Sequence, residues 1–501
     1  MGTDAMPPRE PLIARVRYTT TTALLLALAG CAAGPDFEKP AAPHVQGYTA
    51  APLPAMTGGD STPAGGPQVF KQGQDIPAAW WTLFHSQPLD DLIARALKNN
   101  PDLKAAQAAL ASARETALAQ EGGYYPSVSA DYAVSRQKTS SQLSPTPNSG
   151  DLYFSLYTPQ VSVSYVPDVF GLNRRSVEFL NAQAEQTRYA LIATDIALSA
   201  NVAAAAIQEA ALRAQVDATR ELVSADQDML QVLQKQYAKG YASRLDVAAQ
   251  QSQLAQAAAT LPPLEKQLAA ERDQLAALCG AFPGDAGIQD FDLISLQLPA
   301  ELPLTLPSQL VEQRPDVRQA QENLHAASAQ IGIAAANRLP SFTLSANAGA
   351  MALAANQIFR AGTGVWALAG DISQPLFQGG ALEHREQAAR DAYTQAAEQY
   401  RSTVLTAFQN VADSLNALEQ DAAALKAAAQ AADAAKVTLD LAKRQYQAGY
   451  SGYLALLNAE QAYQQASINL VQAEANRYAD TAALFEALGG GWWNDKDLAK
   501  N

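Results

Sequence analysis

The chain consists of two halves that repeat the same order of motifs about 210 residues apart. Residues 237–241 (YAKGY) return as residues 446–450 (YQAGY), and Leu245 returns as Leu454 with the same offset. The other matching stretches are Pro101-Asp102-Leu103 with Pro315-Asp316-Val317, and Pro126-Ser127-Val128 with Pro340-Ser341-Phe342. Several matches at a nearly constant offset indicate a duplication, so we expect each half to form one structural unit.

Each half contains helix-forming stretches of unusual length. The helices are expected at 102–123, 172–238 and 244–279 in the first half, and at 315–338, 381–448 and 453–488 in the second. The two longest stretches contain no proline and are rich in Ala, Leu, Gln, Glu and Arg, which are good helix formers. At 1.5 Å per residue, some 65 residues extend about 100 Å. Taken alone, these helices favour a long soluble coiled coil.

Each half also contains two segments in which apolar and polar residues alternate, a pattern typical of strands with one apolar face. The strands are expected at 127–136 and 158–167 in the first half, and at 341–350 and 364–374 in the second. In the first of them, Val128, Tyr132 and Val134 alternate with mostly polar residues. A sheet in lipid must close on itself, and four strands cannot close around a lumen. The strands therefore form either a small soluble sheet or part of a barrel to which several copies contribute.

The N-terminus has the pattern of a secretory signal. Three arginines among residues 9–17 precede an apolar run at 23–28, which is too short to span a bilayer as a helix. The run ends in Leu28-Ala29-Gly30-Cys31, which resembles the cleavage box of bacterial lipoproteins. We therefore expect removal of residues 1–30 and a lipid anchor, including palmitate, on Cys31. The alternative is an ordinary signal peptide in which Cys31 has no special role.

Charge and cysteine content narrow the class of protein further. The net charge is −14, and removal of residues 1–30, with three arginines and two acidic residues, changes it to −15. An acidic chain without a basic stripe is not expected to bind nucleic acid. Cys279 is the single cysteine besides Cys31, so we expect no intramolecular disulfide and a buried Cys279 near a helix end. No run of 18 apolar residues follows Cys31, which argues against a transmembrane helix.

The sequence contains no recognisable catalytic constellation. The four histidines are His44, His85, His325 and His384. They are scattered, without metal-ligand spacing and without a nucleophile elbow nearby. We expect no catalysis, no metal and no cofactor apart from the covalent lipid on Cys31.

Several motifs together resemble the TolC/OprM-like outer membrane factor family, in its lipidated NodT-like branch that serves resistance-nodulation-division pumps. They are AWWTLF at 79–84, LDDLI at 89–93, RPDVRQA at 314–320, LFQGG at 376–380, both Tyr-x-x-Gly turns, and LGGGW at 488–492. The resemblance runs from about residue 75 to residue 493. It implies a mixed α and β, mainly α fold in which a homotrimer forms a 12-stranded outer-membrane β-barrel. A long periplasmic α-helical barrel with an equatorial domain would continue it.

The same resemblance implies a function and partners. The chain would be the passive, gated outer membrane channel of a tripartite efflux pump that exports small molecules. Its partners would be a periplasmic adaptor protein, an inner-membrane pump and outer membrane lipid. Two alternatives remain: an outer membrane channel for type I protein secretion, and a lipid-anchored periplasmic coiled-coil scaffold that never spans the membrane.

These arguments divide the chain into five segments. They are a signal peptide (1–30), a lipid anchor with an extended linker (31–87), a first repeat (88–299), a second repeat (300–492) and a C-terminal tail (493–501). In the family, the turns between long and returning helices form the periplasmic tip, which corresponds here to residues 237–247 and 446–458.

The resemblance also implies roles for residues at these tips. The gate and tip residues would be Tyr237, Asp246, Tyr446, Leu454 and Asn458. The adaptor contacts would be Gly240, Tyr241, Ser243, Gly449, Tyr450, Ser451 and Gly452. Asn458 departs from the family because relatives commonly carry a gate aspartate there, and Ala455 lacks a charge found in one branch. For Asp246 two roles are open: a gate carboxylate, or a cap of the returning helix after Ser243.

Overall fold

The computed structural model describes residues 32–45, 47–139, 152–285, 287–289 and 291–500, so Cys31 and the signal segment lie outside it. The chain folds into two compact units. Unit 1 comprises the described residues within 1–39, 111–185 and 321–399, and unit 2 those within 40–110, 186–320 and 400–501. The duplication predicts that each half forms one unit. Instead, both units combine segments from both halves, since each long helix passes from one unit into the other.

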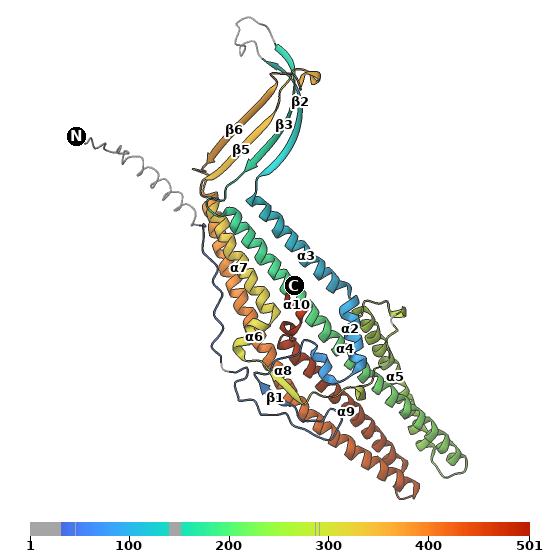
Figure 1. Cartoon of the computed structure of the whole chain (residues 1–501). Helices are drawn as coiled ribbons and strands as arrows, with labels where there is room; N and C mark the ends of the chain where they lie inside the picture. Colours follow the sequence, from blue (N-terminus) through green and yellow to red (C-terminus); the bar gives the residue numbers. More distant parts are fainter. Residues whose placement is uncertain (1–31, 46, 140–151, 286, 290, 501) are drawn as a thin grey trace, which may run out of the picture. The chain divides into compact units, whose positions relative to one another are not determined.

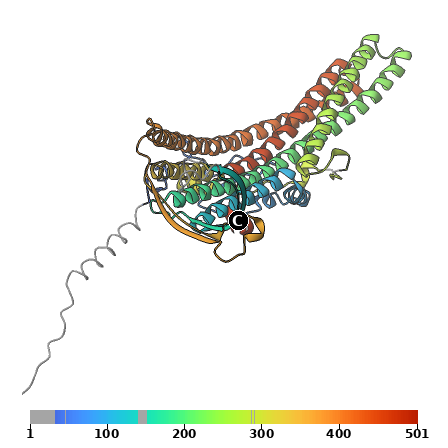
Figure 2. The same cartoon turned by 90° about the horizontal axis from the view of Figure 1, so that it is seen from above.

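The helices occur in pairs that correspond through the repeat (Figure 1). The pairs are α3 (Pro101–Glu121) with α7 (Pro315–Ala336), α4 (Leu172–Ala238) with α8 (Ala381–Gln447), and α5 (Arg244–Leu278) with α9 (Tyr453–Ala487). Shorter helices are α2 (Gln87–Asn99), α6 (Pro307–Gln313) and α10 (Lys496–Lys500). α4 and α8 have 67 residues each. In unit 2, α5 runs back along α4 and α9 runs back along α8, forming two long hairpins (Figures 1 and 2).

Unit 1 contains a four-stranded antiparallel sheet in the order β2-β3-β5-β6 (Figure 1). The strands are β2 (Ser127–Thr139), β3 (Leu152–Tyr165), β5 (Ser341–Ala350) and β6 (Gly364–Ser373). The first two are longer than expected, because cross-strand pairing continues as far as Thr139 and Leu152. Most of residues 138–150, a stretch rich in Ser, Pro and Asn between these two strands, lies outside the described residues. Among the described residues, the outer edges of β2 and β6 have no partner strand.

The strand register separates apolar and polar side chains onto opposite faces of this sheet. Cross-strand neighbours on one face are Val128 with Val163, Val161 with Ala348, Ala346 with Leu368, and Phe342 with Ile372. On the other face they are Ser129 with Ser162, Asp131 with Gln160, Ser162 with Asn347, and Thr343 with Asp371. The apolar face is open in the single chain: Trp366 is 79% and Leu368 77% exposed. The alternation expected from the sequence is therefore realised as one continuous apolar face.

Unit 2 contains the main hydrophobic core. Trp80 stacks on Phe485 at 5.4 Å between ring centroids, and both are almost fully buried. Nearby, β1 (Val69–Gln72) pairs in parallel with β4 (Glu301–Leu304) in a second, two-stranded sheet. Cys279 is buried at the C-terminal end of α5, as expected, and burial raises the pKa of its thiol.

One long helix bears on the sequence argument against a transmembrane helix. Within the described part of the chain, α4 is long and apolar enough to cross a membrane by length and composition, although the sequence argued against any such segment after Cys31. Charged and polar residues interrupt the apolar stretch of α4, so the sequence contains no unbroken run of 18 apolar residues there. Since 61% of that window is buried inside the chain, packing against neighbouring helices accounts for its apolar character.

Candidate functional site at the hairpin tips

The two hairpin turns of unit 2 have the same backbone structure. Gly240 and Gly449 follow the ends of α4 and α8 with φ of +79° and +76°. In the first turn, the Gly240 amide donates to the Tyr237 carbonyl at 2.9 Å and the Tyr241 amide to the Gln236 carbonyl at 2.9 Å. The second turn has the equivalent bonds, from Gly449 and Tyr450. This is the Schellman motif, whose left-handed position favours glycine.

The helices that leave these turns start differently. α5 begins with a capping box: the Ser243 hydroxyl accepts from the Asp246 amide at 3.1 Å, and Asp246 Oδ2 accepts from the Ser243 amide at 2.9 Å. Among the expected roles of Asp246, that of a helix cap is thus present in the structure. α9 begins after Gly452, which offers no side-chain cap. The role of Asp246 in a gate remains a prediction.

Both tips present an aromatic and an aliphatic side chain to solvent at equivalent positions. Tyr241 is 82% exposed and Tyr450 87%, while Leu245 is 77% and Leu454 62% exposed. Tyrosine buries a large area at little loss of conformational entropy and is enriched at the centre of protein interfaces. The duplicated Tyr and Leu pairs therefore suit contact with another protein, and their role as adaptor contacts remains a prediction.

A chain of side-chain contacts joins the two hairpins behind the tips. The Tyr446 hydroxyl of α8 donates to Gln236 Oε1 of α4 at 3.3 Å, and its ring packs edge-on against Tyr453 at 5.8 Å. The buried Tyr453 hydroxyl of α9 donates to Gln250 Oε1 of α5. Gln250 Nε2 in turn donates to the Asp226 carbonyl at 2.8 Å and to Asp226 Oδ1 at 3.1 Å. Separation of the hairpins would break the bonds of Tyr446 and Tyr453, whereas the bonds from Gln250 to Asp226 lie within the α4–α5 hairpin.

A cavity of about 760 Å³ lies between the two turns. Six of the residues expected at the tips line it: Tyr241, Asp246, Tyr446, Gly449, Ser451 and Gly452. Burial, followed by the negative charge of Asp246, raises the pKa of the Tyr446 phenol. The structure therefore brings together residues that the sequence places about 200 positions apart.

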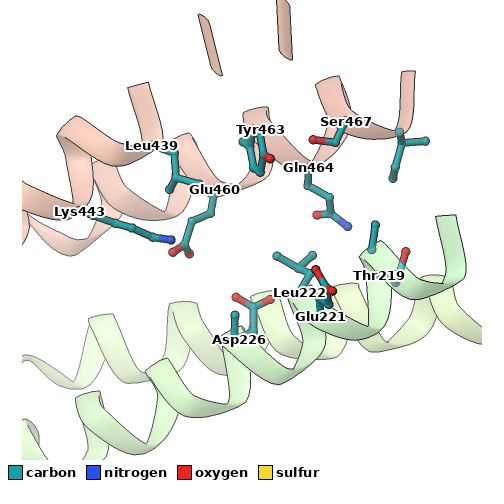
Figure 3. A pocket seen from close by; sticks show the side chains of 13 residues that line it. Thr219, Glu221, Leu222, Asp226, Leu439, Lys443, Glu460, Tyr463, Gln464 and Ser467 are labelled. Atoms are coloured by element: carbon teal, nitrogen blue, oxygen red, sulfur yellow. The ribbon is translucent and has the colours of Figure 1, made fainter. Parts of the chain in front are cut away.

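A second cavity, of about 370 Å³, lies further from the tips between α4, α8 and α9. Figure 3 shows Asp226 of α4 and Glu460 of α9 directed into it from opposite sides, with Lys443 of α8 pointing toward Glu460. Within the described part of the chain, Asp226 Oδ2 and Glu460 Oε2 are buried and have no hydrogen-bond partner. Burial raises the pKa of both carboxyl groups, while Lys443 lowers that of Glu460 and Gln250 that of Asp226. Protonation of Asp226 and Glu460 removes the cost of burying their negative charges, so it favours the close approach of the two hairpins.

The remaining expected residues also lie at or beside the tips. Tyr237 is 49% exposed on the last turn of α4, and Asn458 is exposed one turn after Leu454. The lipid-anchor residue Cys31 lies outside the described residues. Sequence reasoning missed Gln250, Tyr453, Asp226 and Glu460, because in helices so rich in Ala and Gln no periodic pattern identifies the face that the partner hairpin covers.

Comparison with known proteins identifies the family of this chain. Residues 92–281 and 306–490 match the family described as Outer membrane efflux protein. The chain is 31% identical to the toluene efflux pump outer membrane protein TtgF of Pseudomonas putida, covering 94% of this chain and 96% of the relative. It is 30% identical to the pyoverdine export outer membrane protein OpmQ of Pseudomonas aeruginosa, covering 83% and 88%.

A solved structure agrees in fold. The open state of the MtrE outer membrane channel of Neisseria gonorrhoeae is 26% identical, with a TM-score of 0.78, covering 93% of this chain and 99% of that one. The two matched segments coincide closely with the two sequence repeats, and the mainly helical fold with a four-stranded sheet agrees with the expected class. The chain belongs to the Outer membrane efflux protein family.

Proposed function

We propose that three copies of this chain form the outer-membrane exit duct of a tripartite efflux pump. The observation that carries this proposal is the sheet of unit 1, with an exposed apolar face, a polar face and two open edges. In lipid, each unsatisfied backbone group at such an edge costs several kcal/mol, on the order of the desolvation of an amide. Pairing β6 of one copy with β2 of the next removes both edges and yields three times four strands around a polar lumen.

The helices of unit 2 support the same assembly. The α4–α5 and α8–α9 hairpins would line up around the axis and continue the duct into the periplasm. Their tips carry Tyr241 and Tyr450, which we propose as contacts for the helices of a periplasmic adaptor. The links from Tyr446 and Tyr453 to the opposite hairpin would hold the tip narrow at rest, with Asp246 and Leu454 at the opening.

We propose that the cargo consists of small molecules and that the pump partner selects them. The relatives are named for toluene efflux and for pyoverdine export. We further propose that a lipid on Cys31 attaches the protein to the outer membrane. The chain would perform no catalysis, and an inner-membrane pump would supply the energy for transport.

The test is accumulation of small molecules in a bacterial host that lacks its own exit ducts. Expression together with the cognate adaptor and pump should reduce accumulation of at least one organic solvent, dye or antibiotic. Unchanged accumulation by a correctly localised trimer, with loss of a secreted protein on deletion, would support type I protein secretion instead. A periplasmic scaffold would leave residues 127–135 and 342–348 open to protease in intact cells, whereas a barrel protects them.

A further inference from the structure

The segment that directly follows Cys31 is held against unit 1 at a defined place. The Ala33 amide donates to the Phe170 carbonyl at 2.9 Å. Phe170 lies between the end of β3 and the start of α4, and its ring packs at 6.2 Å from that of Phe342 at the start of β5. The segment therefore lies at the end of the sheet where the strands connect to the helices.

A buried arginine binds this segment from the first turn of α4. Arg175 is 4% exposed, and its guanidinium donates Nε to the Ala33 carbonyl at 3.1 Å and Nη2 to Asp36 Oδ1 at 2.7 Å. Nη2 also lies 3.4 Å from the Gly34 carbonyl, and Nη1 donates to Glu178 Oε2 at 2.7 Å. The buried Arg175 guanidinium donates to two carbonyls and two carboxylates, so its position and its hydrogen bonds are fixed, unlike those of an exposed surface arginine.

The backbone of the segment packs with little free space. Gly34 has φ of +85°, and a Cβ added there would lie 2.4 Å from the Gly332 Cα of α7. A Cβ added at Gly332 would lie 2.8 Å from the Ala33 carbonyl oxygen. Two glycines thus permit a close approach of segment and helix that any other residue would prevent.

The next side chain of the segment is also bound. The Phe37 ring stacks on the His325 imidazole of α7 at 4.4 Å with 15° between the planes. The two ring nitrogens of His325 face Glu178 at 3.1 Å and Glu322 at 3.2 Å. Glu178 is shared by His325 and Arg175, so one network of charges supports both contacts to the segment.

We propose that Arg175, Gly332 and His325 form a binding site for residues 32–37 of the same chain, and that this site fixes where the lipid on Cys31 enters the membrane. The proposal rests on the proposed lipid attachment. Cys31 precedes Ala33 by two residues, which span at most about 7 Å, so the lipid is tethered beside the helix-side end of the sheet. An anchor on a free linker would place no demand on the identity of residues 32–37, whereas this site requires Gly34, Asp36 and Phe37.

The test is hydrogen exchange, read by mass spectrometry, of the peptide that contains residues 33–37 in the full-length membrane-extracted protein. Gly34→Ala changes only the bound segment, so it leaves the folding of the helices and strands intact. We expect exchange of the Ala33 amide to accelerate about 10-fold or more, which corresponds to loss of one charge-supported hydrogen-bonded contact. Gly47→Ala is the matched control, because a Cβ at Gly47 meets no atom of the described, non-adjacent residues within 4 Å.

A second pair of variants tests the arginine. Arg175→Met should accelerate the same exchange, while Arg174→Met, at the exposed neighbouring position, should leave it unchanged. Exchange in Gly34→Ala equal to that of the wild type would overturn the proposal. The mass of the N-terminal peptide reports separately whether Cys31 carries lipid. If residues 33–37 are protected from exchange but Cys31 carries no lipid, the lipid anchor is refuted and the binding site stands. If Cys31 carries lipid but residues 33–37 are not protected, only the binding site is refuted.

Discussion

The hydroxyl of Tyr453 is the contact through which the closed arrangement of the hairpins can be tested most directly. It donates to Gln250 Oε1, and Gln250 continues the connection to Asp226. Tyr453→Phe removes this bond and keeps the ring that packs against Tyr446. A buried neutral hydrogen bond contributes about 1 kcal/mol net. If the hairpins separate when the channel opens, the ratio of open to closed channels rises roughly 5-fold per copy.

Three copies that open together amplify this effect. The sum of about 3 kcal/mol corresponds to a roughly 150-fold change in the ratio of open to closed channels. Single-channel conductance in planar bilayers measures this ratio directly. Tyr463→Phe is the matched control, because the Tyr463 hydroxyl lies on the same helix and no hydrogen bond is found for it in the described structure. An open fraction in Tyr453→Phe equal to that of the control would refute the reasoning.

Three further predictions concern other surfaces. Tyr450→Ala should reduce crosslinking to the adaptor while the midpoint of thermal unfolding stays unchanged, because the side chain is 87% exposed; a lower midpoint with normal crosslinking would contradict this. Leu368→Arg on the apolar face should impair insertion into bilayers by about 2–4 kcal/mol, whereas Ala369→Arg on the polar face should insert normally. Hydrogen bonds to Glu322 and, to a smaller extent, to Glu178 raise the pKa of His325, although burial lowers it. The protonated imidazole therefore contributes fully to binding the N-terminal segment at a pH below the pKa of an unfolded histidine. Relative to the intrinsic exchange rate at each pH, exchange of that segment should therefore accelerate as pH rises through the folded pKa of His325, and His325→Gln should abolish this excess acceleration.

The candidate site could be predicted from the sequence only where a local rule applies. Gly240 and Gly449 end their helices because a Schellman turn needs a left-handed residue, and this is visible in the motif YxxGY alone. Ser243 and Asp246 likewise form their capping box within four residues. Gln250 and Tyr453 lie 203 positions apart, and nothing near either residue indicates the other.

The strands illustrate the same division. The alternation of β5 placed it at 341–350, and the structure has Ser341–Ala350. β2 continues beyond its expected end and β3 begins before its expected start, because Thr139 pairs with Leu152 across the hairpin. This pairing depends on both strands, so the sequence pattern of one strand does not reveal it.

By itself, the sequence determined the duplication, the lengths of the helices, the two turns and the two-faced strands. Each of these depends on proline and glycine placement or on periodicity within a few residues of chain. Only the tertiary structure decided that both halves contribute to both compact units, that Arg175 binds the segment after Cys31, and that Asp226 and Glu460 share a cavity. These features arise where residues far apart in the chain pack against one another and exclude water. Local propensities carry no information about which distant residues will pack together.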